Sequence, residues 1–395
     1  MLSNYLKAMG LQSSSNSLCL FTGRLVDGEP PFFVGIYVDD IIYLCVSTTV
    51  ECKFEELLST IGTVDFTGQV SLFLGIEFSW IHHDDGNLSV HLTQQSFAES
   101  LIESLGFEDL SSSTYITPYR SGLSIDSILH EPMTSSDRDA LRLAHPSLVG
   151  SLNWLAHTIR PDLSTVIPIL AQHQSNPSPG HMEAPCYATK YLAHTKTRGL
   201  YFTSQKRSQL ESFLHFPIPP HQVMSMPDAN WGPQDASKSR STFELPLFAS
   251  RSMSAYYIDL LSPLHWLSKR QSVTAGSLAE AKIYATDKCV KFLQELTQIL
   301  DFLGVKSIFM LGINIIYNDN CAYVQWSKCT TTKGLKHIQM KENHVQENIS
   351  SKFAIISHVD GKVNLADIFT KEIKDTTHFV AGFVPKTSTT FLNYC

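Results

Sequence analysis

The stretch "FFVGIYVDDIIYLCVS" at residues 32–47 places two adjacent acids, Asp39 and Asp40, between two runs of apolar and aromatic residues. Such runs on either side of a two-residue turn are typical of a β-hairpin. A hairpin between buried strands would hold both carboxylates rigidly at its tip. Because side chains alternate along a strand, only one of them can be a direct ligand of a metal ion. An ordinary acidic turn is the alternative, since Asp is common in turns.

The composition of the whole chain predicts an ordinary globular protein. Its 395 residues suggest about two or three domains, and 43% of them are hydrophobic and 17% charged. No apolar run is long enough for a membrane helix, and the N-terminus lacks a secretory signal pattern. Eight cysteines without a CxxC pair indicate a reduced, intracellular protein of the cytoplasm or nucleus. The net charge of −7 counts mildly against nucleic-acid binding, although a local basic groove can exist.

The pattern around the hairpin alternates between strands and helices. Apolar spacing predicts a helix over 51–62 that ends at Gly62, strands over 71–80 and 87–93, and a helix over 93–107 with Thr93 as N-cap. Residues 108–140 and 204–222 have the composition of connectors, and 143–199 is helical in pattern. From residue 223 strands and helices alternate again.

Several motifs follow in the order of a known family. "IYVDDIIYL" resembles the YxDD motif of reverse transcriptases, in the form used by copia-type LTR retrotransposons. Further segments resemble that family in the same order: "SLFLGIEF", "LTQQSFAESLIESLGF", "HPSLVGSLNWLAHTIRPDLSTVI", "GHMEAPCYATKYLAHTKTRGLYF", "PDANWG", "STFELPLF", "HWLSKRQSVTAGSLAEAKIYA", "IYNDNCAYV", "KHIQMKENHVQENI" and "NLADIFTKEI". Nearly the whole chain is covered, so the match does not depend on the four residues of YVDD.

The resemblance implies a mixed α+β and α/β architecture. A truncated reverse-transcriptase palm without fingers is expected over 1–118 and a helical thumb or connection region over 119–222. A ribonuclease H-like α/β domain is expected over 223–395. The implied activities are RNA-directed DNA synthesis and cleavage of RNA in RNA–DNA hybrids, both by carboxylates with Mg²⁺ or Mn²⁺. The implied partners are an RNA–DNA hybrid or a template-primer. No membrane partner is expected, and the oligomeric state is left open.

For the polymerase, the resemblance implies that Asp39 is the metal ligand of YxDD and Asp40 its catalytic neighbour. The other catalytic Asp of the family lies on an earlier strand, in a region that precedes Met1 in the family pattern. We therefore expect no DNA synthesis from this chain alone.

For the nuclease, the resemblance implies four metal-binding carboxylates, of which Asp228, Asp319 and Asp367 match the first, third and fourth. A strand-end acid or a helix N-cap is the alternative for each of them taken alone. The second position should be Glu, but the sequence "SLAEAKIYA" has Lys282 there.

Helix geometry tests whether a nearby acid can replace the missing Glu. Lys282 falls on an apolar stripe that continues through Ala285 and Cys289. Glu280 is two residues away, about 200° around the helix, and so points to the other side. We predict that Lys282 pairs with Asp228 or Asp319 and occupies the site without metal. This leaves an impaired nuclease, or weak metal binding by three Asp residues and water.

Other candidates are less specific. His82, His83 and His91 with Asp84 match a solvated hairpin turn better than a metal site. His337 and His344 are predicted to be structural or to lie near the substrate.

One further departure from the family pattern is Pro185, which falls inside a predicted helix, where Pro costs about 3 kcal/mol or more. It is the kind of flaw that a decaying copy accumulates. Whether the chain is an enzyme is therefore open, and the alternative is a non-catalytic retroelement remnant or hybrid-binding scaffold.

Overall fold

The computed structural model describes residues 2–108, 115–120, 132–203, 211, 222–230, 251–260, 262–310, 312–328 and 339–370. They fall into two compact units. The first unit contains Met1–Phe78 and Lys291–Gly312, and the second contains Ser79–Val290 and Ile313–Cys395. The division into functional domains at 1–118, 119–222 and 223–395 stays a prediction.

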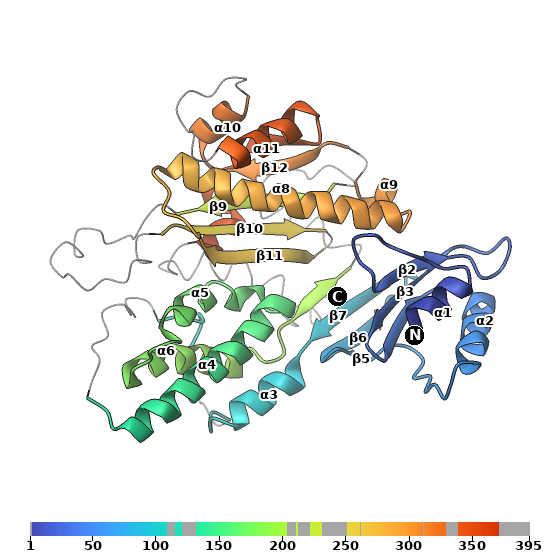
Figure 1. The fold of residues 1–395 in the computed structure, drawn as a ribbon, viewed down its shortest axis with the longest axis horizontal. Coiled ribbons are helices and arrows are strands. Elements are labelled where there is room, and N and C mark those ends of the chain that lie inside the picture. The colour runs from blue at the N-terminus through green and yellow to red at the C-terminus, as the bar shows by residue number, and fades with distance from the viewer. Residues whose placement is uncertain are drawn as a thin grey trace. The chain divides into compact units, whose positions relative to one another are not determined.

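The first unit contains an antiparallel sheet with strand order β1-β2-β3-β4 and the helices α1 and α2 (Figure 1). The bounds are α1 Leu2–Ala8, β1 Gln12–Ser13, β2 Leu20–Gly23, β3 Phe32–Tyr37, β4 Asp40–Leu44, α2 Thr48–Ser59, β5 Leu72–Phe73 and α9 Lys306–Phe309. Alternate residues of β3, Phe32 and Val34, are buried in a core with Phe54 of α2. The predicted hairpin is confirmed, because one face of each of its strands is apolar and is covered.

Two predicted elements of the first unit have different bounds. The helix predicted over 51–62 begins at Thr48, after the N-cap Ser47, and its C-cap is Thr60 rather than Gly62. The strand predicted over 71–80 is broken where Leu74 and Gly75 both have positive φ, so it becomes β5 and then β6. The strand pattern is apolar on both sides of this break, and only Gly75 marks it in the sequence.

The second unit begins with strands and a group of helices. Their bounds are β6 Ile76–His82, which starts in the first unit, β7 Leu88–Thr93, α3 Gln95–Glu103, α4 Ser135–Thr158, η2 Pro161–Leu163, α5 Ile167–Leu170, η3 Ala171–His173, η4 Pro179–Met182, α6 Glu183–His194 and β8 Leu200–Phe202. The N-cap of α3 is Gln94 rather than Thr93, because Thr93 is still part of β7.

Pro185 does not damage the helix in which it lies. It is the third residue of α6, which begins at Glu183 directly after the 3₁₀ turn η4. Amide groups in the first turn of a helix have no partner within that helix, so a proline there removes no hydrogen bond. The prediction that Pro185 is a flaw was wrong, because the sequence pattern did not reveal the break at Met182.

A buried ion pair fixes the turn that follows α4 and ties it to the C-terminal half of α6. The Arg160 guanidinium donates to both carboxylate oxygens of Asp162 at 2.9 and 2.7 Å, and to the carbonyl of Thr195 at 3.0 Å. Tyr191 donates to the same carboxylate at 2.6 Å. Burial alone would raise the pKa of Asp162, but Arg160 holds that pKa below its ordinary value.

The rest of the second unit is a mixed five-stranded sheet with strand order β11-β10-β9-β12-β13. β9, β10 and β11 are antiparallel, whereas β9, β12 and β13 are parallel. The bounds are β9 Met224–Ala229, β10 Met253–Asp259, β11 Pro263–Arg270, α8 Leu278–Phe302, β12 Asn314–Asn318, α10 Cys321–Ser327, α11 Gln339–Ser350, β13 Ala354–His358, η7 Gly361–Val363 and η8 Leu365–Phe369. The residues of α8 from Lys291 onward belong to the first unit. This mixed sheet with helices agrees with the α/β architecture expected for the C-terminal part of the chain.

Hydrogen bonds tie the helices of the second unit to this sheet. Trp266 of β11 donates its indole N–H to the carbonyl of Ala156 in α4 at 2.7 Å. The Thr165 hydroxyl donates to the carbonyl of Ile368 in η8 at 2.9 Å. Helices and sheet therefore share one packed body. Among the described residues, none of the helices combines the length and the apolar character needed to cross a membrane.

Removal of the Arg160 guanidinium should be strongly destabilising, because it leaves Asp162 buried without its counter-charge. We expect Arg160→Met to lower the free energy of unfolding by about 3–5 kcal/mol, measured by urea denaturation. The control is Arg142→Met, an exposed member of a 3.9 Å pair on α4, which should change it by less than about 0.5 kcal/mol. Equal effects of the two substitutions would contradict the assignment.

A second prediction concerns acid stability. Burial, with a smaller effect from His157, lowers the pKa of His265 to about 4. Because the folded chain favours the neutral ring of His265, the stability that depends on this ring is fully present above about pH 6.5. It is lost as the pH falls toward 4. Between pH 7 and pH 5, we expect the free energy of unfolding of His265→Gln to fall by about 2 kcal/mol less than that of the unsubstituted chain. Urea titrations at the two pH values measure this difference. An equal loss of stability in His265→Gln and in the unsubstituted chain between pH 7 and 5 would contradict this assignment.

Candidate functional site

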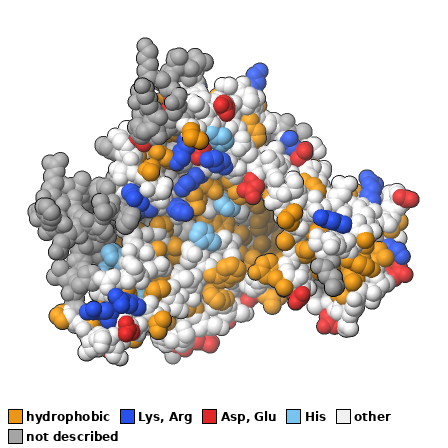
Figure 2. Space-filling view, in the orientation of Figure 1, with side chains coloured by type: hydrophobic (Ala, Val, Ile, Leu, Met, Phe, Trp, Pro, Cys, Tyr) orange, Lys and Arg blue, Asp and Glu red, His pale blue; other side chains and the backbone are white. Residues whose placement is uncertain are grey.

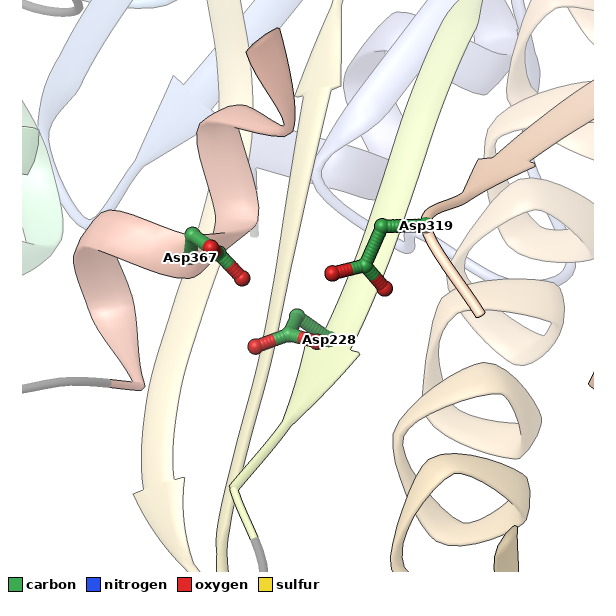
Figure 3. A group of neighbouring side chains, drawn as sticks. All are labelled: Asp228, Asp319 and Asp367. Carbon is green, nitrogen blue, oxygen red and sulfur yellow. The ribbon is translucent and has the colours of Figure 1, made fainter. Parts of the chain in front are cut away.

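Three aspartates converge at one end of the mixed sheet (Figure 3). Asp228 is near the end of β9, Asp319 directly follows β12, and Asp367 lies in η8. Because β9 and β12 are parallel neighbours, their carboxyl ends meet at the same edge. One carboxylate oxygen of each residue lies within 4.8 Å of the others. The structure therefore brings together the three acids that the sequence singled out, as a group that could hold a metal ion.

Asn318 holds Asp319 beside Asp228. Its side chain is buried, donates to the carbonyl of Pro227 at 3.1 Å, and accepts from the amide of Asn320 at 3.0 Å. Asn320 in turn caps α10. Sequence reasoning missed this role of Asn318, although the amides on both sides of the acid in "YNDN" were the available signal.

The helix η8 that carries Asp367 is held at its C-terminal end. Three consecutive carbonyls accept hydrogen bonds from side chains of three separate segments: Ile368 from Thr165, Phe369 from Ser268 and Thr370 from Asn230, at 2.9, 2.7 and 2.8 Å. Carbonyls at a helix end have no partner within the helix, so these donors satisfy them. The Thr370 hydroxyl also donates to Oδ2 of Asp228 at 2.5 Å.

Lys282 of α8 reaches into this group. Its Nζ lies 2.7 Å from Oδ1 of Asp228 and 2.6 Å from Oδ1 of Asp319, and the residue is only 4% exposed. Burial alone would lower the pKa of Lys282, but the charges and hydrogen bonds of the two aspartates raise it above its ordinary value. The predicted pairing is confirmed, and it involves both aspartates at once.

Small residues let α8 approach β9 closely enough for this contact. Ala281 and Ala285 of the helix cluster with Ala229, which directly follows Asp228 in β9. Lys282 lies three residues before Ala285, on the same side of the helix, and therefore faces the same strand. A longer side chain at these positions would move the ammonium away from Asp228.

Glu280 does not join the acidic group. Its carboxylate accepts from the amide of Gly276 at 2.7 Å, and its own amide donates to the Ser277 hydroxyl at 3.1 Å. It therefore caps the N-terminus of α8, in the manner of a capping box. The expectation that Glu280 cannot replace the missing ligand is consistent with this geometry, although its side chain is buried rather than directed to solvent.

The YVDD hairpin differs in detail from the prediction. The two turn residues are Val38 and Asp39, whereas Asp40 is the first residue of β4 and pairs with Tyr37. Both acids are exposed, and in the part of the chain that the structure describes neither belongs to a group of three possible metal ligands. Val38 has φ +54°, which is strained for a β-branched residue. The role of Asp39 as a metal ligand stays a prediction.

Among the histidines that the sequence singled out, His82 is exposed and His83 bonds to the Ser89 hydroxyl at 2.7 Å. The expectation of a solvated turn was wrong for His91, which lies in β7 and is buried against the ring of Tyr201. His344 of α11 bonds to Asp287 of α8 at 2.9 Å, which joins the two helices. His337 lies outside the described residues.

The residues present fit a two-metal centre poorly. Such a centre gathers carboxylates around two divalent cations, but here an ammonium already bridges two of the three acids. Three carboxylates (−3) and one ammonium (+1) leave a charge of −2, whereas the four carboxylates of the family pattern would carry −4. The cation that balances the site is part of the chain.

Comparison with curated proteins finds relatives along nearly the whole chain. It is 25% identical over 374 residues to the Retrovirus-related Pol polyprotein from transposon RE2 of Arabidopsis thaliana, covering 94% of this chain and 23% of that protein. The corresponding polyprotein from RE1 of the same plant is 24% identical over 387 residues, covering 95% and 23%. That from transposon TNT 1-94 of Nicotiana tabacum is 21% identical over 371 residues, covering 94% and 25%. The chain thus spans about a quarter of the length of these relatives.

Other comparisons give weaker likenesses. No protein-family model matches the chain. LC11-RNase H1 in complex with an RNA/DNA hybrid aligns at a TM-score of 0.27 and 12% identity, covering 38% of this chain and 94% of that one. The foamy viral protease-reverse transcriptase in complex with dsDNA aligns at 0.38 and 12%, covering 83% and 55%. The Pol polyproteins alone confirm the resemblance drawn from the sequence motifs.

The strained turn residue gives a third prediction. A left-handed conformation costs an L-residue about 1–2 kcal/mol, and Gly avoids this at an entropic cost of about 0.5–1 kcal/mol. We expect Val38→Gly to leave the free energy of unfolding unchanged or to raise it by up to about 1 kcal/mol, by urea denaturation. Val34→Gly, a buried position of the same hairpin, should lower it. A clear loss of stability in Val38→Gly would argue against strain at this turn.

Proposed function

We propose that this chain, which corresponds to a region of the Pol polyproteins of copia-type retrotransposons, binds an RNA–DNA hybrid through its ribonuclease H-like unit but is impaired in cleaving it. The observation that carries the proposal is the contact of Lys282 with Asp228 and Asp319. Reverse transcription and metal-dependent cleavage of RNA in hybrids are the reactions inherited from the family.

The impairment follows from competition for the same oxygens. In the family pattern Mg²⁺ or Mn²⁺ would be held by Asp228, Asp319 and Asp367 together with a Glu, and would supply charge stabilisation and an activated water. A divalent cation that approaches Asp228 and Asp319 here must displace a buried ammonium with two short, charge-assisted hydrogen bonds. The affinity of the acidic group for metal is therefore low.

Binding of nucleic acid does not need the missing Glu. On the face drawn in Figure 2, several Lys and Arg side chains lie near one another, with Asp and Glu side chains among them. Lys and Arg side chains bind a phosphate backbone without reading its sequence. We propose a hybrid or a template-primer as the partner on this basis and on the family resemblance. The chain as a whole remains acidic, at −7, so the binding depends on this local arrangement.

DNA synthesis by the described residues is not part of the proposal. Asp39 sits on an exposed turn as the proposed metal ligand, with Asp40 beside it, and a two-metal polymerase centre needs further carboxylates close by. The proposed parts are a palm region over 1–118, a thumb or connection over 119–222 and a ribonuclease H-like region over 223–395. The second candidate function, a non-catalytic hybrid-binding scaffold, is favoured by the same Lys282 contact.

Cleavage and binding assays test both candidates, and recovery of cleavage on Lys282→Glu distinguishes an impaired nuclease from a scaffold. The purified chain receives a labelled RNA–DNA hybrid with Mg²⁺ or Mn²⁺, and binding is measured in parallel by fluorescence anisotropy. We expect binding without specific cleavage. Lys282→Glu should restore cleavage, because it supplies the fourth carboxylate and removes the competing cation.

The control is the double variant Lys282→Glu/Asp319→Asn, which should be inactive again. Specific cleavage by the unsubstituted chain that disappears on Asp319→Asn would falsify the impaired-nuclease reading. Failure of every variant to bind the hybrid would remove the proposed partner.

A further inference from the structure

We infer that Lys282 is a built-in counter-ion that replaces divalent metal as a structural part of the acidic centre, so that the second unit folds with no need for a metal ion. This goes beyond the proposed function, because it concerns what holds the fold together rather than what the site binds or cleaves. It also assigns a structural cause to the misfit between the acidic group and a two-metal centre.

The three aspartates lie close together and two of them are buried, which makes their negative charges costly. Asp228 and Asp367 are 2% and 8% exposed, and an oxygen of each lies within 4.8 Å of the other and of Asp319. Like charges held that close in a poorly solvated site disfavour ionisation. A group of this kind needs protons, a bound metal or a cationic side chain in order to remain folded.

The ammonium of Lys282 lies where it balances the charges of two acids from neighbouring strands. Nζ contacts one oxygen of Asp228 on β9 and one of Asp319 after β12, at 2.7 and 2.6 Å. The two contacts bridge parallel strands at their carboxyl ends, as a shared metal ion would. A second oxygen of Asp228 is already satisfied by the Thr370 hydroxyl.

Contacts at the start of α8 fix the position of Lys282. Glu280 and Ser277 fix the first turn of α8, and the alanine cluster fixes its approach to β9. Removing the ammonium from this buried setting would leave its partners without a counter-charge, which is far more costly than losing an exposed ion pair. The contact therefore stabilises the carboxyl ends of β9 and β12.

Metal dependence of thermal stability tests the inference without any nucleic acid. The midpoint of thermal unfolding is measured for the full chain with EDTA and with millimolar Mg²⁺ or Mn²⁺, and hydrogen exchange of the β9 and β12 amides locates the change in the second unit. We expect the midpoint of the unsubstituted chain to be the same in both conditions. Lys282→Glu should melt several degrees lower in EDTA and recover with metal, because a ligand that binds only the folded state stabilises it.

Two further variants make the result specific. Lys282→Met keeps most of the side-chain volume without the charge, so it should also be weakened in EDTA and stabilised by Mn²⁺. Lys291→Glu makes the same charge change at an exposed position of α8 and should show no metal dependence. The inference is overturned if metal raises the unfolding midpoint of the unsubstituted chain as much as that of Lys282→Glu. It is also overturned if both Lys282 variants have the same midpoint in EDTA as Lys291→Glu.

A direct measurement covers the case in which Lys282→Glu does not fold under any condition. Mn²⁺ binding to the unsubstituted chain is followed by electron paramagnetic resonance, and no site that depends on Asp367 is expected. Binding that is lost on Asp367→Asn would overturn the inference. Neither experiment uses a hybrid, so failure of the proposed nucleic-acid function would leave this result to be judged by itself.

Discussion

A buried carboxylate needs a positive charge or hydrogen-bond donors beside it, and at two places in the described part of the second unit a Lys or Arg of the chain supplies the charge. Asp162 is paired with Arg160 between the helices, and Asp228 with Asp319 is paired with Lys282 at the end of the sheet. Arg160, Asp162, Asp228 and Lys282 are almost inaccessible to water, so their charges act through a medium that screens them weakly, whereas Asp319 is 19% exposed. The helices and the sheet are each organised around one of these contacts.

The two pairs differ in what they connect. Arg160 and Asp162 are two residues apart, so their pair shapes a local turn, and it then bonds to Tyr191 of α6 and to Thr195, the C-cap of that helix. Lys282 is 54 and 37 residues from its partners, so its contact can form only when α8, β9 and β12 are already assembled. The first contact specifies a turn, whereas the second depends on the completed fold and stabilises it.

Sequence patterns predicted the parts of this structure that depend on short-range periodicity. The hairpin over 32–47 and the inward position of Lys282 followed from alternation and from the helical stripe, and both are found. The strained turn at Val38, the break before Glu183 and the capping role of Glu280 were not predicted. These features depend on local backbone geometry that several sequences could satisfy. The donors Thr165 and Asn318 also escaped prediction, because their partners lie 203 and 91 residues away.

The hydrogen bond from Thr165 to Ile368 limits which segments of the chain can be exchanged by recombination. It places a hydroxyl of the helical region against the short helix that carries Asp367. An exchange of segments between related elements, with its junction between residues 203 and 222, would join a helical region to a sheet that had adapted to another partner. The geometry of the acidic group would then shift even if all of its own residues were kept. The helical region that contains Thr165 and the sheet region that contains Asp367 therefore keep the geometry of the acidic group only when they are inherited together.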